Sequence, residues 1–407
     1  MLSIKAVLSL LAILVSVDAN AVKRDSGKGT IRFAAKVNVA GAANIAELDQ
    51  ARAFQIIQTA TKRKRGGVPF SVTNSAVSYI ATVGVGSPPT SYDLIVDTGS
   101  SNTWVGANKT YVQTSSSQNT GHTVDVSYGS GNFTGEEWID TVTFNTVNSG
   151  SLTIYKQSIG VAKQSNGFSE GVDGILGVGP TDLTRGTVSD SDEIPTVTDN
   201  LLSQGSIDAN ILGVYFVPAS NPDNHGELTF GGVNNDAAVS EIEYVPITST
   251  SPASTYWGVD QTITYGGQTI LSETAGIVDT GTTLIALASD AFARYQAATG
   301  GTMDDNTGLL KISTEQYVAL KTLTFTIGGI DYDLTPNAQI WPRALNEQIG
   351  GESGAIYLIV TDIGTKSGSG LDFINGYAFL ERFYTVYDTD NARVGFARTA
   401  YTDSATN

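Results

Sequence analysis

The chain has 407 residues, a formal net charge of −17 at pH 7 and no cysteine. Without cysteine it can form no disulfide, and thiol catalysis, cysteine-ligated zinc and iron–sulfur clusters are excluded. The negative charge argues against nucleic acid or an anionic membrane surface as a partner, because both would repel the protein.

The first 21 residues have the features of a secretory signal peptide. Lys5 precedes a short apolar run at residues 6–17 (AVLSLLAILVSV), and the small residues Ala19 and Ala21 follow. The run is too short for a membrane helix, which needs roughly 20 apolar residues. We therefore expect residues 1–21 to be removed and the protein to be secreted (extracellular), with a buried N-terminal helix as the alternative.

Residues 22–65 are interpreted as a pro-segment. The stretch 22–69 carries ten Lys or Arg and three Asp or Glu, whereas the rest of the chain is strongly acidic. The segment shows no clear strand pattern and ends in KRKR (62–65) before two glycines, which is typical of a processing site. The alternative is a solvated basic loop. A basic segment facing an acidic body suggests a contact that acid would loosen by protonating carboxylates.

From residue 68 onward the pattern predicts an all-β protein with few short helices. Short alternating runs, such as 78–86 (SYIATVGVG) and 323–329 (LTFTIGG), are separated by turn residues. We expect three helices: one after Ser289 and Asp290 that ends at Gly300, one begun by a Ser313–Gln316 capping box, and one opened by Pro195.

The sequence LIVDTGSS at 94–101 returns as GIVDTGTT at 276–283. Each copy is followed by an apolar run that leads to glycine, ILG at 175–177 and FING at 373–376. The polar stretch 247–255 (ITSTSPAST) lies between the copies. We therefore expect two related lobes, residues 66–246 and 256–407, joined by residues 247–255.

The repeated turn has a specific chemical use. An apolar strand leads in each copy to an aspartate, Asp97 or Asp279, followed by Thr, Gly and a hydroxyl. If the turns face each other, the two carboxylates cannot easily both ionise, so the pair shares a proton. The ionised member can then take a proton from water while the other protonates a carbonyl oxygen. One such turn alone would be ordinary, but two matching copies favour catalysis.

These motifs identify the chain as similar to the pepsin-like aspartic proteases over essentially residues 68–402. The motifs are VDTGSSNTWVGA (96–107), YGSGNFTG (128–135), GVDGILGVGP (171–180), AGIVDTGTTL (275–284) and LDFINGYAFLERFYTVYDTDNARVGFA (371–397). The resemblance implies a bilobal fold of two related β-barrel lobes with a cleft between them. It also implies a monomeric acid endopeptidase that cleaves peptides and proteins between bulky apolar residues, needs no cofactor, and is inhibited by its own pro-segment.

The resemblance also implies a role for each matching residue. Asp97 and Asp279 would be the catalytic pair, and Thr98 and Thr280 would bond across the pseudo-twofold axis. The turns would be completed by Gly99, Ser100, Gly281 and Thr282, with Ser100 and Thr282 bonding the outer carboxylate oxygens. The substrate would be covered by a hairpin flap that carries Tyr128, Gly129 and Ser130, with Trp104 as a hydrogen-bond partner of Tyr128. A pro-segment lysine would block the pair, and Lys62 or Lys64 could do this here, although the same residues could equally be the cut site. We hypothesise self-activation at low pH.

The chain departs from the family in three places. It lacks the usual disulfides, so its stability must come from packing. Asn375 stands where many relatives have an apolar residue, which means either that its side chain is hydrogen-bonded or that the strand is shifted by one. Ser130 replaces the aspartate with which several relatives accept lysine, so we expect poor cleavage after lysine.

Smaller signals complete the analysis. Asn108 and Asn132 begin possible N-glycosylation triplets, of which Asn108 is favoured because Asn132 lies on the expected flap; chance occurrence is the alternative. The two histidines, His122 and His225, form no cluster, and we expect no metal site. Two rival functions are a catalytically silent pepsin-fold binding protein and a glycan-active enzyme with paired carboxylates, although the latter would not need matching DTG turns.

Overall fold

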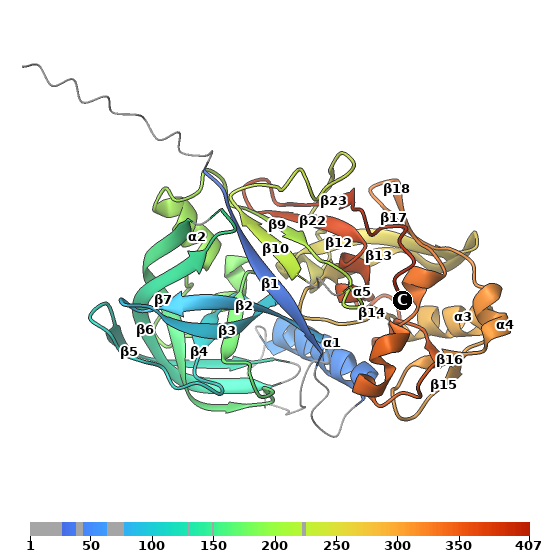
Figure 1. Ribbon diagram of the computed structural model, residues 1–407, viewed down its shortest axis with the longest axis horizontal. Helices are drawn as coiled ribbons and strands as arrows, with labels where there is room; N and C mark the ends of the chain where they lie inside the picture. The colour runs from blue at the N-terminus through green and yellow to red at the C-terminus, as the bar shows by residue number, and fades with distance from the viewer. Residues whose placement is uncertain (1–26, 38–43, 63–76, 129–130, 149, 222–224) are drawn as a thin grey trace, which may run out of the picture.

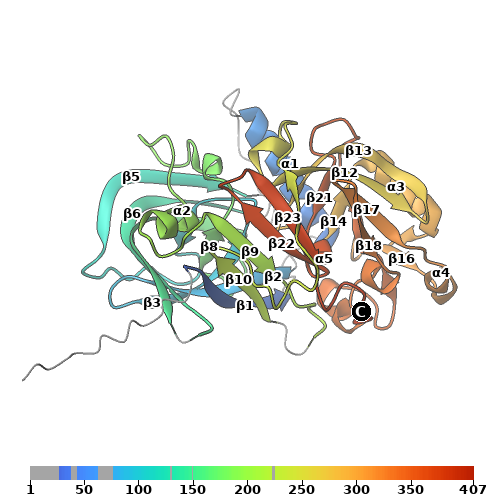
Figure 2. The same cartoon turned by 90° about the horizontal axis from the view of Figure 1, so that it is seen from above.

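The computed structural model describes residues 27–37, 44–62, 77–128, 131–148, 150–221 and 225–407. Their strands form three sheets, arranged as two β-rich lobes (Figures 1 and 2). The predicted mostly-β, bilobal fold is therefore confirmed. The predicted signal peptide at residues 1–21 lies outside the described residues.

The largest sheet has the strand order β11-β23-β22-β9-β10-β1-β2-β3-β8-β4-β7-β6-β5. Its strands are β1 (Gly29–Val37), β2 (Val77–Val85), β3 (Thr90–Asp97), β4 (Thr103–Val105), β5 (Gln118–Ser127), β6 (Asn132–Asn145), β7 (Ser151–Asn166), β8 (Gly174–Gly177), β9 (Ile211–Tyr215), β10 (His225–Phe230), β11 (Glu243–Pro246), β22 (Phe383–Asp388) and β23 (Arg393–Arg398).

The second sheet has the order β18-β17-β12-β13-β21-β14-β20, and a small third sheet has the order β15-β16-β19. Their strands are β12 (Gly258–Tyr265), β13 (Gln268–Val278), β14 (Ile285–Leu287), β15 (Thr302–Met303), β16 (Leu310–Ile312), β17 (Leu323–Ile327), β18 (Ile330–Leu334), β19 (Ile356–Tyr357), β20 (Val360–Asp362) and β21 (Phe373–Asn375). The stretch 247–255 thus runs from the first sheet to the second.

The described α-helices are α1 (Ile45–Lys62), α2 (Val197–Ser203), α3 (Ser289–Thr299), α4 (Thr314–Val318) and α5 (Tyr377–Leu380). Short 3₁₀ helices occur at η1 (Thr181–Thr184), η2 (Ala253–Thr255), η3 (Asn337–Gln339) and η4 (Arg343–Ile349). The three predicted helices are present as α2, α3 and α4.

The ends of these helices agree with the predictions in two cases. Ser313 and Gln316 form the predicted capping box of α4, and α3 ends at Gly300, whose φ of 71° is left-handed. Pro195 does not open α2, however. Thr196 and Asp199 form a capping box there, so the helix begins after the threonine.

The N-terminal segment is more ordered than the sequence indicated. β1 lies between β10 and β2 and pairs antiparallel with both, and α1 follows it. α1 lies between the two lobes in both views (Figures 1 and 2). Its buried apolar residues are Ile45, Ala46, Leu48, Ala53 and Ile56. Their helical spacing is diluted by alanine and by buried polar residues, which is why the pattern was missed.

Both lobes contain the same three-strand unit. In the first, β8 runs parallel to β3, with Ile175 beside Ile95, and β4 places Trp104 beside Ile175 on its other side. In the second, β21 runs parallel to β13, with Ile374 beside Ile277, and β14 places Ala286 beside Ile374. Each aspartate follows two residues after its paired isoleucine, Ile95 or Ile277. The duplication seen in the sequence is therefore a duplication of strand register.

Burial of apolar side chains holds both lobes together. The largest core cluster includes Val96 from the first repeat, Val278 from the second and Trp257 near the junction. Removal of apolar surface from water is the main stabilising term in a fold without disulfides.

Within the described ranges, no helix has both the length and the hydrophobicity of a membrane span.

Candidate active site

The two repeated turns bring Asp97 and Asp279 to one place. Asp97 is the last residue of β3 and Asp279 directly follows β13, and their exposures are only 1% and 0%. A buried carboxylate needs hydrogen-bond donors to offset its desolvation. Each turn supplies these donors locally.

The two carboxylates are held in matching ways. The N–H of Gly99 donates to Asp97 Oδ1 at 3.0 Å, and Ser100 Oγ donates to Oδ2 at 2.5 Å. The N–H of Gly281 donates to Asp279 Oδ1 at 3.0 Å, and Thr282 Oγ1 donates to Oδ2 at 2.6 Å. The inner oxygens thus receive backbone donors and the outer oxygens receive hydroxyls. This is the arrangement expected for Ser100 and Thr282.

The threonines of the two turns bond across the lobe boundary. The N–H of Thr98 donates to Thr280 Oγ1, and the N–H of Thr280 donates to Thr98 Oγ1, both at 3.0 Å. Thr280 Oγ1 donates in turn to the Val96 carbonyl at 3.0 Å, and Thr98 Oγ1 to that of Val278 at 3.5 Å. These reciprocal bonds fix the two turns, and hence the two aspartates, relative to each other.

The glycines of the turns allow the carboxylates to approach. A Cβ at Gly99 would lie 2.7 Å from Asp279 Oδ1, and one at Gly281 would lie 2.5 Å from Asp97 Oδ1. Both distances are far below ordinary van der Waals contact. Each turn therefore passes directly against the opposite carboxylate, and only glycine fits.

Arg52 from α1 contacts both aspartates. Its Nη2 lies 2.5 Å from Asp97 Oδ1 and 2.9 Å from Asp279 Oδ1, while its Nε lies 2.6 Å from Asp279 Oδ2. The expectation that Lys62 or Lys64 would occupy this position is wrong. Lys62 is the last residue of α1, and Lys64 lies outside the described residues. A planar guanidinium can bond two carboxylates at once, which a lysine ammonium does less specifically.

Arg52 changes the titration of the site. Burial acts to raise the pKa of Asp279, but the charge and hydrogen bonds of Arg52, together with those from Thr282 and Gly281, outweigh burial, so this pKa lies below its ordinary value. Burial likewise opposes the charge of Arg52, yet the two aspartates raise its pKa. Arg52 therefore stays charged, and its ion pair with Asp279 persists until that carboxylate is protonated.

Asp49 forms a second contact between α1 and the C-terminal repeat. Its carboxylate is 2% exposed and accepts the N–H of Thr283 at 3.1 Å and that of Leu284 at 2.6 Å. Burial raises the pKa of Asp49 to about 7, although these hydrogen bonds and Arg52 act to lower it. Asp49 and Arg52, three residues apart, lie on one face of the helix.

The predicted flap is a hairpin of β5 and β6. Ser127 pairs with Asn132, and the N–H of Tyr128 donates to the Gly131 carbonyl at 2.7 Å. Gly129 and Ser130 lie outside the described residues. The pKa of Tyr128 lies well above its usual range because the side chain is buried and close to the charge of Asp97.

The Tyr128 and Trp104 rings stack with centroids 6.4 Å apart. Trp104 Nε1 and the Tyr128 hydroxyl are both buried without a hydrogen-bond partner among the described residues. The two side chains are brought together, and Trp104 acts to lower the pKa of Tyr128, but no hydrogen bond of good geometry joins them. Trp104 packs more closely on Phe133, at 4.2 Å between centroids.

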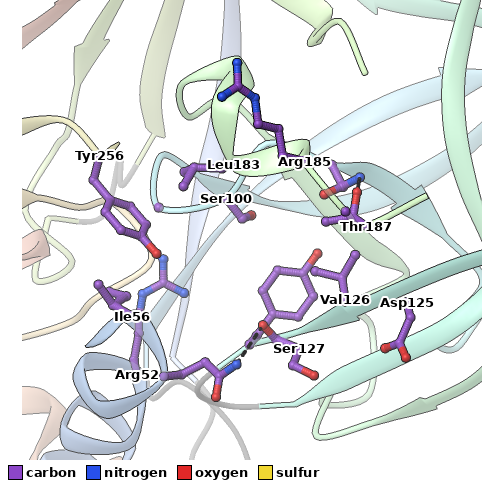
Figure 3. Close-up of a pocket in the computed structure, with 15 residues that line it drawn as sticks. Arg52, Ile56, Ser100, Asp125, Val126, Ser127, Leu183, Arg185, Thr187 and Tyr256 are labelled. Carbon is purple, nitrogen blue, oxygen red and sulfur yellow. Dashed lines mark hydrogen bonds between the residues drawn. The ribbon is translucent and has the colours of Figure 1, made fainter. Parts of the chain in front are cut away.

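A cavity of about 380 Å³ lies beside the aspartates. Figure 3 shows Arg52 and Tyr256 at one side of this space, with Val126 and Ser127 of the flap strand opposite. Gln55 Nε2 of α1 also reaches the Ser127 carbonyl at 3.5 Å. The helix thus occupies the space between the flap and the aspartates.

The structure distinguishes the two possibilities for Asn375, a hydrogen-bonded side chain or a strand shifted by one residue. Its side chain is fully buried and exchanges hydrogen bonds with Gln261, so the strand is not shifted. Sequence reasoning missed Arg52, Asp49 and Gln261. The available signal was weak: Asp49 and Arg52 are charged residues three positions apart, in a stretch that also contains Glu47 and several glutamines.

The remaining predicted sites make no contact with the aspartate pair. Asn108 Nδ2 donates to the carbonyls of Ser169 and Val172, at 2.8 and 2.7 Å, so a glycan there would disturb both bonds. Asn132 instead accepts a bond from Asn166 at its side-chain oxygen. The described residues contain no group of His, Asp and Glu side chains able to hold a metal ion.

Comparisons with known proteins agree with this geometry. Residues 78–399 match the family model described as eukaryotic aspartyl protease. Polyporopepsin from Irpex lacteus is 60% identical over 346 residues, covering 84% of this chain and 99% of that protein. Pepsin A from Rhinolophus ferrumequinum is 32% identical, covering 80% of this chain and 82% of that protein.

A solved structure is also similar to this chain. The crystal structure of aspartic proteinase from Irpex lacteus matches with a TM-score of 0.78 and 59% identity, covering 81% of this chain and 96% of that one. The repeated DTG turns, the facing carboxylates and these similarities agree with one another. The chain belongs to the eukaryotic aspartyl protease family and is a pepsin-like aspartic endopeptidase.

Proposed function

We propose that this protein is a secreted acid endopeptidase, made as an inactive precursor, that hydrolyses peptide bonds with water activated between Asp97 and Asp279. The observation that carries the proposal is that one atom, Arg52 Nη2, bonds the inner oxygens of both carboxylates. A water molecule at that point would lie within hydrogen-bonding distance of both after α1 leaves. This is the placement that general acid–base catalysis requires.

Removal of Arg52 changes the charge state of the pair. Electrostatic repulsion disfavours the ionisation of two carboxylates in such proximity, so Asp97 and Asp279 would share one proton. The hydrogen bonds from Gly99, Ser100, Gly281 and Thr282 orient all four carboxylate oxygens. The pair therefore offers one base and one acid in fixed positions.

Hydrolysis would follow from these two roles. The ionised aspartate takes a proton from water as the water oxygen attacks the peptide carbonyl carbon, and the other aspartate protonates the carbonyl oxygen. In the resulting tetrahedral intermediate, the aspartate that took the water proton gives it to the amide nitrogen, and the other aspartate takes a proton back from a hydroxyl as the C–N bond breaks. No bond between enzyme and substrate is needed, because each aspartate only exchanges protons.

Digestion of haemoglobin in mild acid tests this function. We expect the matured protein to cleave haemoglobin, a statine-type inhibitor to stop the cleavage, and the Asp97→Asn variant to be inactive under the same conditions. The inhibitor occupies the point between the carboxylates, so its effect distinguishes the paired-aspartate mechanism from a contaminating protease. An inactive parent that still binds peptide would support the catalytically silent alternative.

We further propose that residues 22–65 inhibit the enzyme before activation. The support is that α1 places Arg52 on both aspartates, Gln55 against the flap strand and Asp49 on the backbone after the second turn. A substrate could not reach the pair while the helix is docked. The inhibiting cation in this proposal is Arg52.

Two carboxylates at the contact between α1 and the C-terminal repeat, Asp279 and Asp49 of α1 itself, respond to acid in opposite ways. Because docking lowers the pKa of Asp279 below its ordinary 3.8, its contribution to docking is present above that pH and is lost as the pH falls further. Because docking raises the pKa of Asp49 to about 7, its contribution is full below pH 3.8 and is lost as the pH rises through 7. Docking should therefore be firm in weak acid and loosen only in stronger acid.

We expect cleavage between bulky apolar residues and little cleavage after lysine. Ile56 of α1 packs in one cluster with Leu183 and Tyr256, so departure of the helix would expose an apolar wall to the substrate. Ser130 lacks the charge that would attract lysine. Profiling a peptide library with the matured enzyme checks this preference, and strong cleavage after lysine would contradict it.

The remaining features of the proposal come from the sequence. Export as a monomer, the lobe boundaries at residues 66–246 and 256–407, the connection at 247–255, and glycosylation at Asn108 or Asn132 remain predictions. The bonds made by the Asn108 amide favour Asn132 as the acceptor. The flap position of Asn132 would place a glycan beside the cleft.

A further inference from the structure

A buried pair of amide side chains lies behind the turn that carries Asp279. Asn375 Nδ2 donates to Gln261 Oε1 at 2.8 Å, and Gln261 Nε2 donates to Asn375 Oδ1 at 3.3 Å. Their exposures are 0% and 1%. Each amide thus satisfies the other in a region otherwise closed to water.

The pair joins the two neighbours of the strand that leads to Asp279. Gln261 belongs to β12 and Asn375 ends β21, and β13 lies between these strands in the sheet. Asn375 also touches the turn through its backbone, because its carbonyl accepts the N–H of Asp279 at 3.1 Å. One residue therefore contacts Gln261 through its side chain and Asp279 through its main chain.

The first repeat lacks this device. Leu176 lies beside Val96 as Asn375 lies beside Val278, and Leu176 is fully buried in the apolar core. An apolar side chain packs without a preferred direction, whereas a two-bond amide pair fixes orientation. The difference between the repeats is therefore a difference in how rigidly the strand beside each aspartate is held.

We propose that the Asn375–Gln261 pair is a positioning device that sets the orientation of Asp279 toward Asp97. By fixing the end of β21, the pair fixes the carbonyl that holds the Asp279 backbone. Loss of one amide alone would leave its partner buried and unsatisfied, which destabilises the fold. Replacement of both by apolar groups can be nearly neutral for stability, so the two effects can be separated. This inference rests on the proposed catalytic role of Asp279.

The test compares the matured parent with an Asn375→Leu/Gln261→Leu double variant. We expect thermal stability close to that of the parent, KM unchanged, and kcat reduced tenfold or more, because a misplacement of 1 Å can cost about 10²-fold. The acidic limb of the pH profile of kcat should also shift, since the hydrogen bonds of Asp279 set its pKa. An exchanged pair, Asn375→Gln/Gln261→Asn, should recover part of the lost kcat.

A matched control is available in the other lobe. Asn200 Nδ2 donates to Gln157 Oε1 at 2.9 Å, and Gln157 is 1% exposed. Gln157 Nε2 also donates to the carbonyls of Ser158 and Pro195, at 3.0 and 3.1 Å, and these acceptors would lose their donor in the Gln157→Leu/Asn200→Leu variant. This variant should therefore lose stability without a shift of the pH profile.

A double leucine variant with the parent's kcat and pH profile would overturn the proposal. If that variant does not fold, Gln261→Met is measured in the same way, and a parental profile there has the same meaning. An Asp279→Asn enzyme as active as the parent would instead refute the catalytic role of Asp279, so the two failures are distinguishable.

Discussion

Replacement of Asp279 by Asn is expected to lower kcat by about 10²–10⁴-fold, the range that a positioned acid or base contributes. Asn can keep the hydrogen bond from the Gly281 N–H, because its side-chain oxygen can take the place of Oδ1. It cannot take or release a proton at the working pH. KM should change little, since peptide binding extends along the cleft and the lost interaction belongs to the transition state.

The double variant Asp97→Asn/Asp279→Asn sharpens this expectation. If the two aspartates share a proton and act as a unit, the double variant should be about as inactive as either single variant. Multiplied losses would mean that the two groups act independently. Asp304→Asn is a matched control, because Asp304 accepts bonds from the N–H and hydroxyl of Thr307 in an unrelated turn. Its kcat should equal that of the parent.

The aspartate pair could be predicted from sequence because its chemistry is local and duplicated. Each carboxylate is held by the next glycine and by a hydroxyl three residues on, so one short motif contains the whole hydrogen-bonding set. Ile175 pairs with Ile95 and Ile374 pairs with Ile277, and each of these pairs lies two residues before the aspartate. The two repeats therefore share one strand register. Periodicity and turn residues were likewise sufficient to predict a mostly-β fold.

Contacts between distant segments could not be predicted in the same way. Arg52 reaches Asp279 across 227 positions, and its role depends on how α1 docks. A cluster of four basic residues at 62–65 was a stronger sequence signal than one arginine within a helix, so lysine was expected there. Gln261 was missed for the same reason, since nothing in its neighbourhood indicates a partner 114 positions away.

A precursor with Arg52→Met is expected to hydrolyse peptides near pH 6, where the parent precursor should be silent. Methionine preserves most of the side-chain length but leaves two buried carboxylates without their cation. Removal of one partner from a buried ion pair costs about 3–5 kcal/mol, which would raise the undocked fraction by roughly two to four orders of magnitude. The measurement is the initial rate of peptide cleavage, with the precursor shown by mass to be uncleaved.

Lys62→Met and Lys64→Met are the controls, because these lysines were the candidates for the same position. Both variants should stay silent at pH 6 and activate at the same acidic pH as the parent. Slower cutting of Lys64→Met would place the processing site in the basic cluster. The parent should remain docked from about pH 7 to 4, where protonated Asp49 supports docking, and release below that range as Asp279 is protonated.

Activity of the Lys62 variant with silence of the Arg52 variant would reverse the assignment, and equal silence of all three would show that α1 blocks the cleft without the ion pair.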